Sequence, residues 1–217
     1  TNPTAIEFFT REALEYSETF LGKKFPDQNS PAYILLTFDG SQSEVDENAK
    51  KASELLINEF EAVDVLIVDT DERNEDVWSA RGSFLEAIKA STPLMDECDV
   101  VVPRSEVSDY IKYTYELEEK YGLRLPSFGH AGDGNLHIYI CKDDLSDEEW
   151  EVKLDLVFYD LYKRAKEVGG LVSGEHGIGY AKMEYLKESL GDVQINLMRS
   201  IKLAFDPKNL LNPGKVV

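Results

Sequence analysis

Cysteine is scarce in this chain, long hydrophobic runs are absent, and basic residues are outnumbered. Only Cys98 and Cys141 occur among 217 residues. They lie far apart and outside any metal-type pairing, which argues against a disulfide framework or a zinc ribbon and favours a reducing setting. No apolar run approaches the ~20 residues that span a bilayer, and the first residues lack the basic and apolar regions of a signal peptide. We therefore expect a cytoplasmic protein without a membrane span.

The charge balance limits the kinds of molecule that this chain can bind. The chain has 23 basic and 42 acidic residues, a formal net charge of −19. This charge repels phosphate backbones and anionic lipids, so nucleic acid and membrane surfaces are poor partners. It also repels an anionic substrate at long range, so a site for one would need an arginine or a metal ion nearby. The 42% of hydrophobic residues predict one well-buried domain over residues 1–217.

The spacing of apolar residues predicts helices that cover a sheet, an α+β fold. Strands are expected at 31–40, 64–70 and 99–107, and a further strand follows a glycine-rich loop within 124–144. Helices are expected over 3–21, 43–60 with Ser43 as its N-cap, 72–91, 105–122 and 146–170, and a last helix begins at 194 and runs into a turn-rich tail.

All three histidines lie in glycine-rich segments. His130 and His137 belong to GHAGDGNLH, and His176 follows Glu175 in SGEHG. Glycine permits backbone conformations closed to other residues, so these side chains could converge. A His, His, Glu set suits a divalent transition ion and leaves coordination positions open for a substrate. An isolated histidine is more often an ordinary hydrogen-bonded residue, and the spacing alone leaves both interpretations open.

Four segments resemble, in matching order, the C-terminal domain of FAD-linked oxidases: DVVVPRSEV, GHAGDGNLH, SGEHGIG and FDPKNLLNPGKV. This family includes the flavin subunit of glycolate oxidase, D-lactate dehydrogenase and D-2-hydroxyglutarate dehydrogenase. The resemblance, which runs from PTAIEFF to the tail, implies a ferredoxin-like antiparallel sheet covered by helices, the cap domain of a vanillyl-alcohol-oxidase-type flavoprotein. It also implies that a domain preceding this chain binds the FAD and that the chain alone is inactive.

The same resemblance implies roles for individual residues. His130, His137 and Glu175 would bind zinc, manganese or iron, and His176 would accept the proton of the substrate hydroxyl. Arg81 would grip the substrate carboxylate as the intact enzyme passes a hydride to the flavin. Asn212, in LLNPGK, would contact the cofactor if the tail returns to the flavin domain. By its sequence alone, this segment is equally a helix stop with Pro213.

Two positions depart from the family pattern. Relatives often carry asparagine where Tyr139 stands, and D-2-hydroxyglutarate dehydrogenases carry a substrate-binding lysine where Glu97 stands. A glutamate disfavours a second substrate carboxylate, so we expect a small monocarboxylic 2-hydroxy acid such as lactate or glycolate. The other expected partners are a flavin-binding domain or subunit and an electron-acceptor protein. A cap domain without the flavin domain on which it packs should also expose apolar surface and self-associate as a homo-oligomer.

Two other classes of function use the same residues. A non-enzymatic module would dock on a separate flavoprotein and complete its site. A free-standing metallohydrolase would use the same ligands to activate water, although nothing that resembles a leaving-group acid accompanies them.

Overall fold

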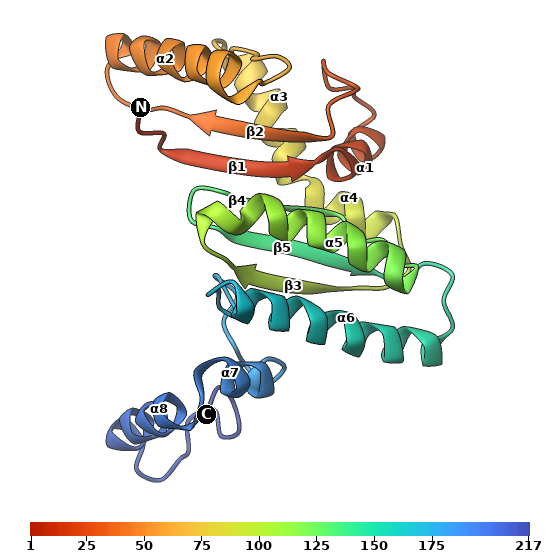
Figure 1. Cartoon of the computed structure of the whole chain (residues 1–217), viewed down its shortest axis with the longest axis vertical. Coiled ribbons are helices and arrows are strands. Elements are labelled where there is room, and N and C mark those ends of the chain that lie inside the picture. The colour runs from red at the N-terminus through yellow and green to blue at the C-terminus, as the bar shows by residue number, and fades with distance from the viewer.

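The fold is organised around a five-stranded sheet, seen in a computed structural model that describes residues 1–217 (Figure 1). Its strands stand in the order β2-β1-β4-β5-β3, and every neighbouring pair is antiparallel. The strands are β1 (Ala5–Thr10), β2 (Ala32–Thr37), β3 (Met95–Val101), β4 (Ser127–His130) and β5 (Asn135–Cys141). The expected α+β fold with an antiparallel sheet is confirmed.

Eight α-helices surround or extend this sheet. They are α1 (Arg11–Leu21), α2 (Gln42–Phe60), α3 (Asp71–Gly82), α4 (Phe84–Ala90), α5 (Val107–Tyr121), α6 (Asp147–Glu167), α7 (Met183–Leu190) and α8 (Asp192–Phe205). Figure 1 shows α5 in front of β4 and β5, α4 behind them, and α7 and α8 beyond α6 at one end of the molecule. None of these helices combines the length and the apolar character needed to cross a membrane.

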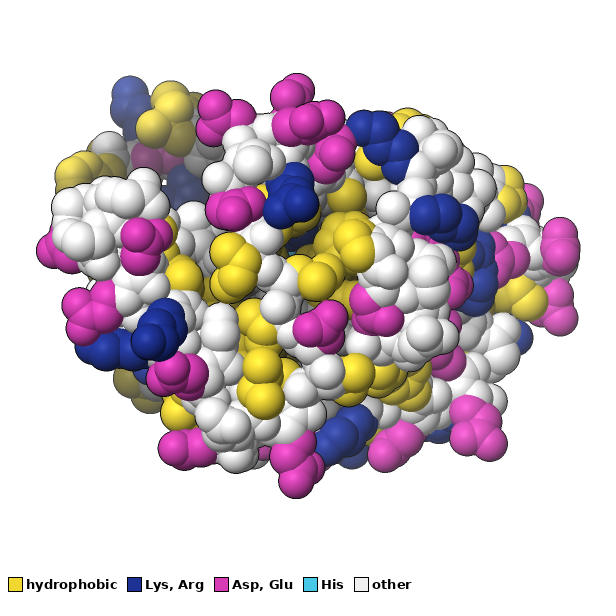
Figure 2. Space-filling view, turned by 90° about the horizontal axis from the view of Figure 1, so that it is seen from above, with side chains coloured by type: hydrophobic (Ala, Val, Ile, Leu, Met, Phe, Trp, Pro, Cys, Tyr) yellow, Lys and Arg dark blue, Asp and Glu magenta, His cyan; other side chains and the backbone are white.

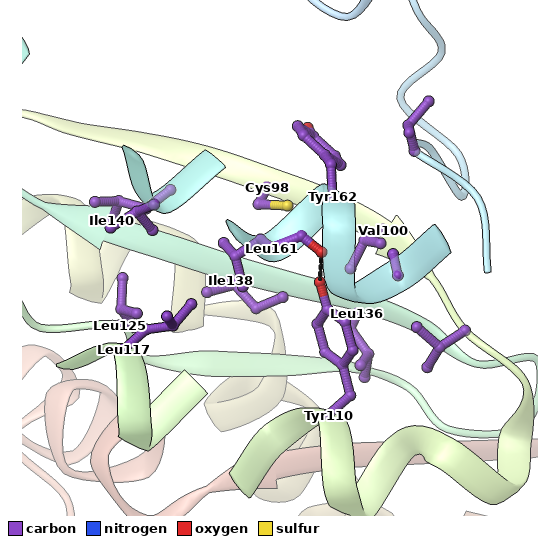
Figure 3. Packing of buried hydrophobic residues seen from close by; sticks show 14 of the residues in the cluster. Cys98, Val100, Tyr110, Leu117, Leu125, Leu136, Ile138, Ile140, Leu161 and Tyr162 are labelled. Atoms are coloured by element: carbon purple, nitrogen blue, oxygen red, sulfur yellow. Dashed lines mark hydrogen bonds between the residues drawn. The ribbon is translucent and has the colours of Figure 1, made fainter. Parts of the chain in front are cut away.

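One face of the sheet is apolar along its centre. Because side chains alternate along a strand, Leu136, Ile138 and Ile140 of β5 all point to this face, and all are fully buried. Helices α5 and α6 cover them, and the hydroxyl of Tyr110 donates to the carbonyl of Leu161 at 2.6 Å (Figure 3). Burial raises the pKa of the Cys98 thiol in this core to about 12. Both cysteines are free, as the sequence predicts.

The opposite face is divided between an apolar end and a polar end. At the apolar end, α1 and α4 cover a cluster of aromatic side chains. At the polar end, the strands present acids and histidines instead. The apolar members are Phe9, Phe128, Tyr139 and Cys141, and the polar members are Glu7, Glu97, Asp99, His130 and His137.

The predicted opening helix over 3–21 is wrong in its first half. Residues Ala5–Thr10 form β1, and the helix begins only at Arg11, after Thr10 accepts a hydrogen bond from the Ala13 backbone N–H at 3.4 Å. The spacing of Ile6 and Phe9 matches a helix, but this segment forms a strand because it pairs with β2 on one side and with β4 on the other. Pairing with distant strands overrides the local helical spacing here.

Other element predictions need smaller corrections. Residues 64–70 form no strand, because this apolar run pairs with no neighbour in the sheet. The predicted helix over 72–91 is divided at Ser83, so that α4 can bury Phe84 and Ile88 against the sheet. The N-cap of α2 is Ser41 rather than Ser43, and α7 was not predicted. The other predicted strands and helices are present, with shifted ends.

The expected apolar surface is present in two places. The C-terminal part exposes Val193, Phe205 and Leu210, with 80%, 86% and 71% of their surfaces accessible. At the other end, Ile34 on the edge strand β2 and Phe60 at the end of α2 are exposed. Figure 2 views this end and shows hydrophobic side chains gathered in a central hollow. Self-association through such a surface stays a prediction.

Glu118 on α5 makes the stability of this fold depend on pH. Burial raises the pKa of its carboxyl to about 7, against the effect of a hydrogen bond from the Leu125 backbone N–H. The ordinary value is 4.5, so the unfolded chain ionises first as the pH rises. The folded chain therefore binds the extra proton between these values, and its free energy of unfolding falls from pH 4.5 to about 7.

Glu118→Gln keeps the acceptor for Leu125 and removes this titration. We expect the variant to exceed the wild type in free energy of unfolding at about pH 8, and to lose that advantage near pH 4, because the wild-type carboxyl is then neutral in both states. Urea denaturation at both pH values measures the difference. Glu116→Gln, at an exposed position of the same helix, is the control. Equal stabilities of E118Q and wild type at about pH 8 would contradict the prediction.

Candidate metal and substrate site

The β4–β5 hairpin brings His130 and His137 together. A Cβ on Gly129 would lie 2.3 Å from the carbonyl oxygen of Asn135, and one on Gly134, at φ +83°, would lie 2.0 Å from that of Val102. These close approaches require glycine. The two histidines consequently lie on one face of the sheet, with ring centroids 5.6 Å apart.

The loop between α6 and α7 completes the cluster. Glu175 Oε1 lies 3.3 Å from His137 Nε2, 3.7 Å from His130 Nε2 and 3.8 Å from His176 Nε2. Three imidazoles from two distant segments thus direct the same ring nitrogen toward one carboxylate oxygen. The four residues that the sequence singled out as ligands and base are brought together.

The opposite nitrogens of these rings contact two further carboxylates. His130 Nδ1 lies 2.8 Å from Glu7, and His137 Nδ1 lies 2.8 Å from Glu97. Glu97 also lies 3.5 Å from His176 Nδ1. In the neutral tautomer that donates from Nδ1 to these carboxylates, Nε2 of His130 and of His137 keeps its lone pair toward Glu175.

This donor set suits a divalent cation. His130 Nε2, His137 Nε2 and a Glu175 oxygen all lie within 4.8 Å of one another, and without a positive charge their lone pairs repel. Neutral imidazoles with Nδ1 bonded to a carboxylate are the usual arrangement of metal-binding histidines. Glu97, His137 and His176 form a second group whose atoms are equally close. In this group, Glu97 and His137 Nδ1 already bind each other through a hydrogen bond.

Arg81 lies beside this cluster on α3. Its Nε and Nη2 lie 2.9 and 2.7 Å from Glu7 Oε2, and its guanidinium stacks 4.6 Å from the centre of the Phe128 ring. Its side chain is 13% exposed, so it is not an ordinary solvent-facing arginine. Through Glu7 it is linked to His130.

Asn212 is placed differently. It is exposed in the turn that follows α8, with φ 45°, and its hydrogen bonds are to Lys215. The structure does not bring it to the histidines. Its expected contact with a flavin stays a prediction.

Sequence reasoning missed two acids of this site, Glu7 and Asp99, and noted Glu97 only as a departure from relatives. Each has the same signal, an acidic residue inside a run of apolar strand residues. Glu7 interrupts AIEFF and Asp99 interrupts CDVVV. An acid at such a position requires a buried partner.

Burial raises the pKa of Tyr139, and the nearby Glu97 carboxylate raises it further. This tyrosine is 2% exposed and stacks on Phe128 with ring centroids 5.3 Å apart. It therefore stays neutral and fills the space between the apolar end of this sheet face and the histidines.

Comparison with solved structures supports the fold. The structure of p-cresol methylhydroxylase with substrate bound superposes with a TM-score of 0.69 over 98% of this chain and 46% of that chain, at 16% identity. A 4-ethylphenol oxidase from Gulosibacter chungangensis gives 0.61 over 98% of this chain and 47% of that chain, also at 16% identity. These structures share the α+β fold of this chain.

Curated relatives match along almost the whole chain. A D-lactate dehydrogenase of Anaerostipes hadrus is 46% identical over 99% of this chain, and one of Archaeoglobus fulgidus is 37% identical over 99%. Glycolate oxidase subunit GlcD of Bacillus subtilis is 34% identical over 99%. The chain spans 46%, 46% and 45% of these relatives, about half their length. The family model described as FAD linked oxidases, C-terminal domain, matches residues 1–216, and the chain belongs to this family.

Proposed function

We propose that this chain is the substrate- and metal-binding part of an FAD-dependent dehydrogenase of small 2-hydroxy acids, of the D-lactate or glycolate type. The observation that carries the proposal is the convergence of three imidazole Nε2 atoms on one oxygen of Glu175. The family and the names of its relatives support the same reaction class. A flavin bound by another part of the protein would supply the hydride acceptor.

His130, His137 and Glu175 would hold a divalent ion such as zinc, manganese or iron. When bound, such an ion lowers the pKa of a hydroxyl that it coordinates and leaves positions open for the substrate. The carboxylates of Glu7 and Glu97 keep the two ligand rings in the required tautomer and orientation.

His176 is the proposed proton acceptor. Oxidation of an α-hydroxyl to a keto group removes one proton from oxygen and one hydride from carbon. The side chain of His176 is 46% exposed, and its Nε2 faces the same point as those of the ligand histidines. With Nδ1 toward Glu97, Nε2 is the nitrogen that can accept the hydroxyl proton.

Arg81 is the proposed partner of the substrate carboxylate. Its Nε and Nη2 are engaged by Glu7, which fixes the plane of the guanidinium and leaves Nη1 for a second carboxylate. A guanidinium that is already held in place donates to a carboxylate with less loss of side-chain entropy than a free one.

The preference for a monocarboxylic acid follows from Glu97 and Tyr139. Neither supplies a cation, and Glu97 would repel a second substrate carboxylate. Lactate and glycolate have only the carboxylate beside the reacting carbon. D-2-hydroxyglutarate carries another.

A zinc titration of the 217-residue chain tests the metal site. We expect the wild type to bind one zinc ion per chain. The zinc affinity should fall more than about 100-fold in His137→Ala, because a ligand is lost, and less than about ten-fold in His176→Ala. Isothermal titration calorimetry measures both. Absence of zinc binding by the wild type, or equal losses in the two variants, would refute the assignment.

Arg81→Ala should destabilise the fold by about 3 kcal/mol, because Glu7 is left as a buried charge without its cation. Arg73→Ala is the matched control, since Arg73 pairs with Asp69 where both side chains are about two-thirds exposed; its loss should cost less than about 0.5 kcal/mol. Urea denaturation compares them. A similar small cost for both variants would show that Glu7 and Arg81 are not a buried pair.

Glu97→Lys tests substrate choice in the intact enzyme. We expect the wild type to have a higher kcat/KM for D-lactate than for D-2-hydroxyglutarate, and the variant to shift this ratio about ten-fold toward the dicarboxylate. Steady-state dye reduction with both substrates gives the ratio, which is independent of overall losses in activity. Asp96→Lys makes the same charge change on the other face of β3 and should leave the ratio unchanged. A wild type that prefers D-2-hydroxyglutarate would overturn the assignment.

A further inference from the structure

Asp99 is a fully buried acid in the middle of the site. It lies on β3 directly opposite His137, with 0% of its surface accessible. Its carboxylate accepts hydrogen bonds from Ser173, Asn135 and the His176 backbone, and the Lys182 ammonium lies 3.2 Å from it. A buried acid with so many partners has a role beyond packing, because burying a charge is costly unless it is paired and hydrogen-bonded.

The donors to Asp99 come mainly from the loop that carries Glu175 and His176. Two are backbone N–H groups at short distance, from Gly174 at 3.1 Å and His176 at 2.9 Å, and that of Glu175 lies at 3.4 Å. The hydroxyl of Ser173 donates at 2.7 Å. Successive backbone N–H groups that converge on one anion define the path of the backbone. Here the anion belongs to the protein itself.

Two residues outside the loop complete the arrangement. Asn135 donates to Asp99 at 2.8 Å, and a Cβ on Gly174 would lie 2.2 Å from its side-chain nitrogen. Lys182 Nζ lies 3.2 Å from Asp99 Oδ2 and supplies the compensating charge, with a side chain that is 13% exposed. The loop is thus held on the sheet from both of its ends.

We propose that Asp99 is the positioning residue that assembles the Glu175–His176 half of the site before any ion binds. Its carboxylate holds the backbone of 173–176 so that the Glu175 and His176 side chains point toward His130 and His137. Neither Asp99 oxygen faces the metal position, because both accept hydrogen bonds from the loop. The effect on metal affinity rests on the proposed function; the effect on the loop does not.

Amide hydrogen exchange of the metal-free 217-residue chain tests the loop directly. In Asp99→Asn, which keeps the size of the side chain, we expect the amides of residues 174–176 to exchange at least about ten-fold faster, because their bonds to a charged acceptor are weakened. The amides of β5 should be unaffected. Unchanged protection of residues 174–176 would overturn the proposal.

Zinc affinity gives the second readout. We expect Asp99→Asn to bind zinc about 10–100-fold more weakly than the wild type. Asp206→Asn is the matched control, because Asp206 accepts from the Leu210 and Leu211 backbones and from Lys202 in the same manner, within the C-terminal segment. It should loosen its own turn and leave zinc affinity unchanged. Equal zinc affinity of D99N and wild type would overturn the role of Asp99 in the metal site. If the wild type does not bind zinc, the metal site is refuted, and the exchange experiment still tests whether Asp99 holds the loop.

If Asp99→Asn does not fold, Ser173→Ala and Lys182→Met probe the same contacts one at a time. Each removes a single donor to Asp99, so each should accelerate exchange at 174–176 by a smaller factor. Exchange unchanged in both variants would contradict the proposal.

Discussion

The alternation of side chains along the sheet is the constraint on which the rest of the structure depends. It gives one face to Leu136, Ile138 and Ile140 and the other to His137 and Tyr139. Antiparallel register then places Asp99 opposite His137, and Glu7 opposite His130. A shift of any strand by one residue would turn these polar groups into the apolar core. The stability of the core therefore fixes the position of the site.

Carboxylates around the histidines add the next level of order. Glu7 and Glu97 contact Nδ1 of His130 and His137, Arg81 pairs with Glu7, and Asp99 accepts hydrogen bonds from the loop that carries Glu175. The chain is strongly acidic, yet most of the acids in this region have defined hydrogen-bond partners. The polar end of the sheet is thus a connected network rather than a set of separate side chains, and such networks are stable only when their members are satisfied.

Much of the site could be predicted from the sequence because its residue types are rare. Three histidines in glycine-rich segments, one of them beside Glu175, are visible without any knowledge of the fold, and their order along the chain matches the family. Glu7 was missed because residues 3–21 also have helical spacing, and in a helix an acid at this position would be ordinary. The absence of a strand at 64–70 was equally unpredictable, since strand formation depends on a partner edge and not on the apolar run itself.

The strand β2 stands at one margin of the sheet, with no strand on its outer side and with Ile34 exposed. An open margin of this kind offers backbone N–H and C=O groups to a strand of any other molecule. The net charge of −19 opposes that encounter, because like-charged molecules repel over roughly a Debye length, about 8 Å at physiological ionic strength. The acidic surface thus acts as a colloidal barrier against aggregation through this strand, and added salt weakens the barrier.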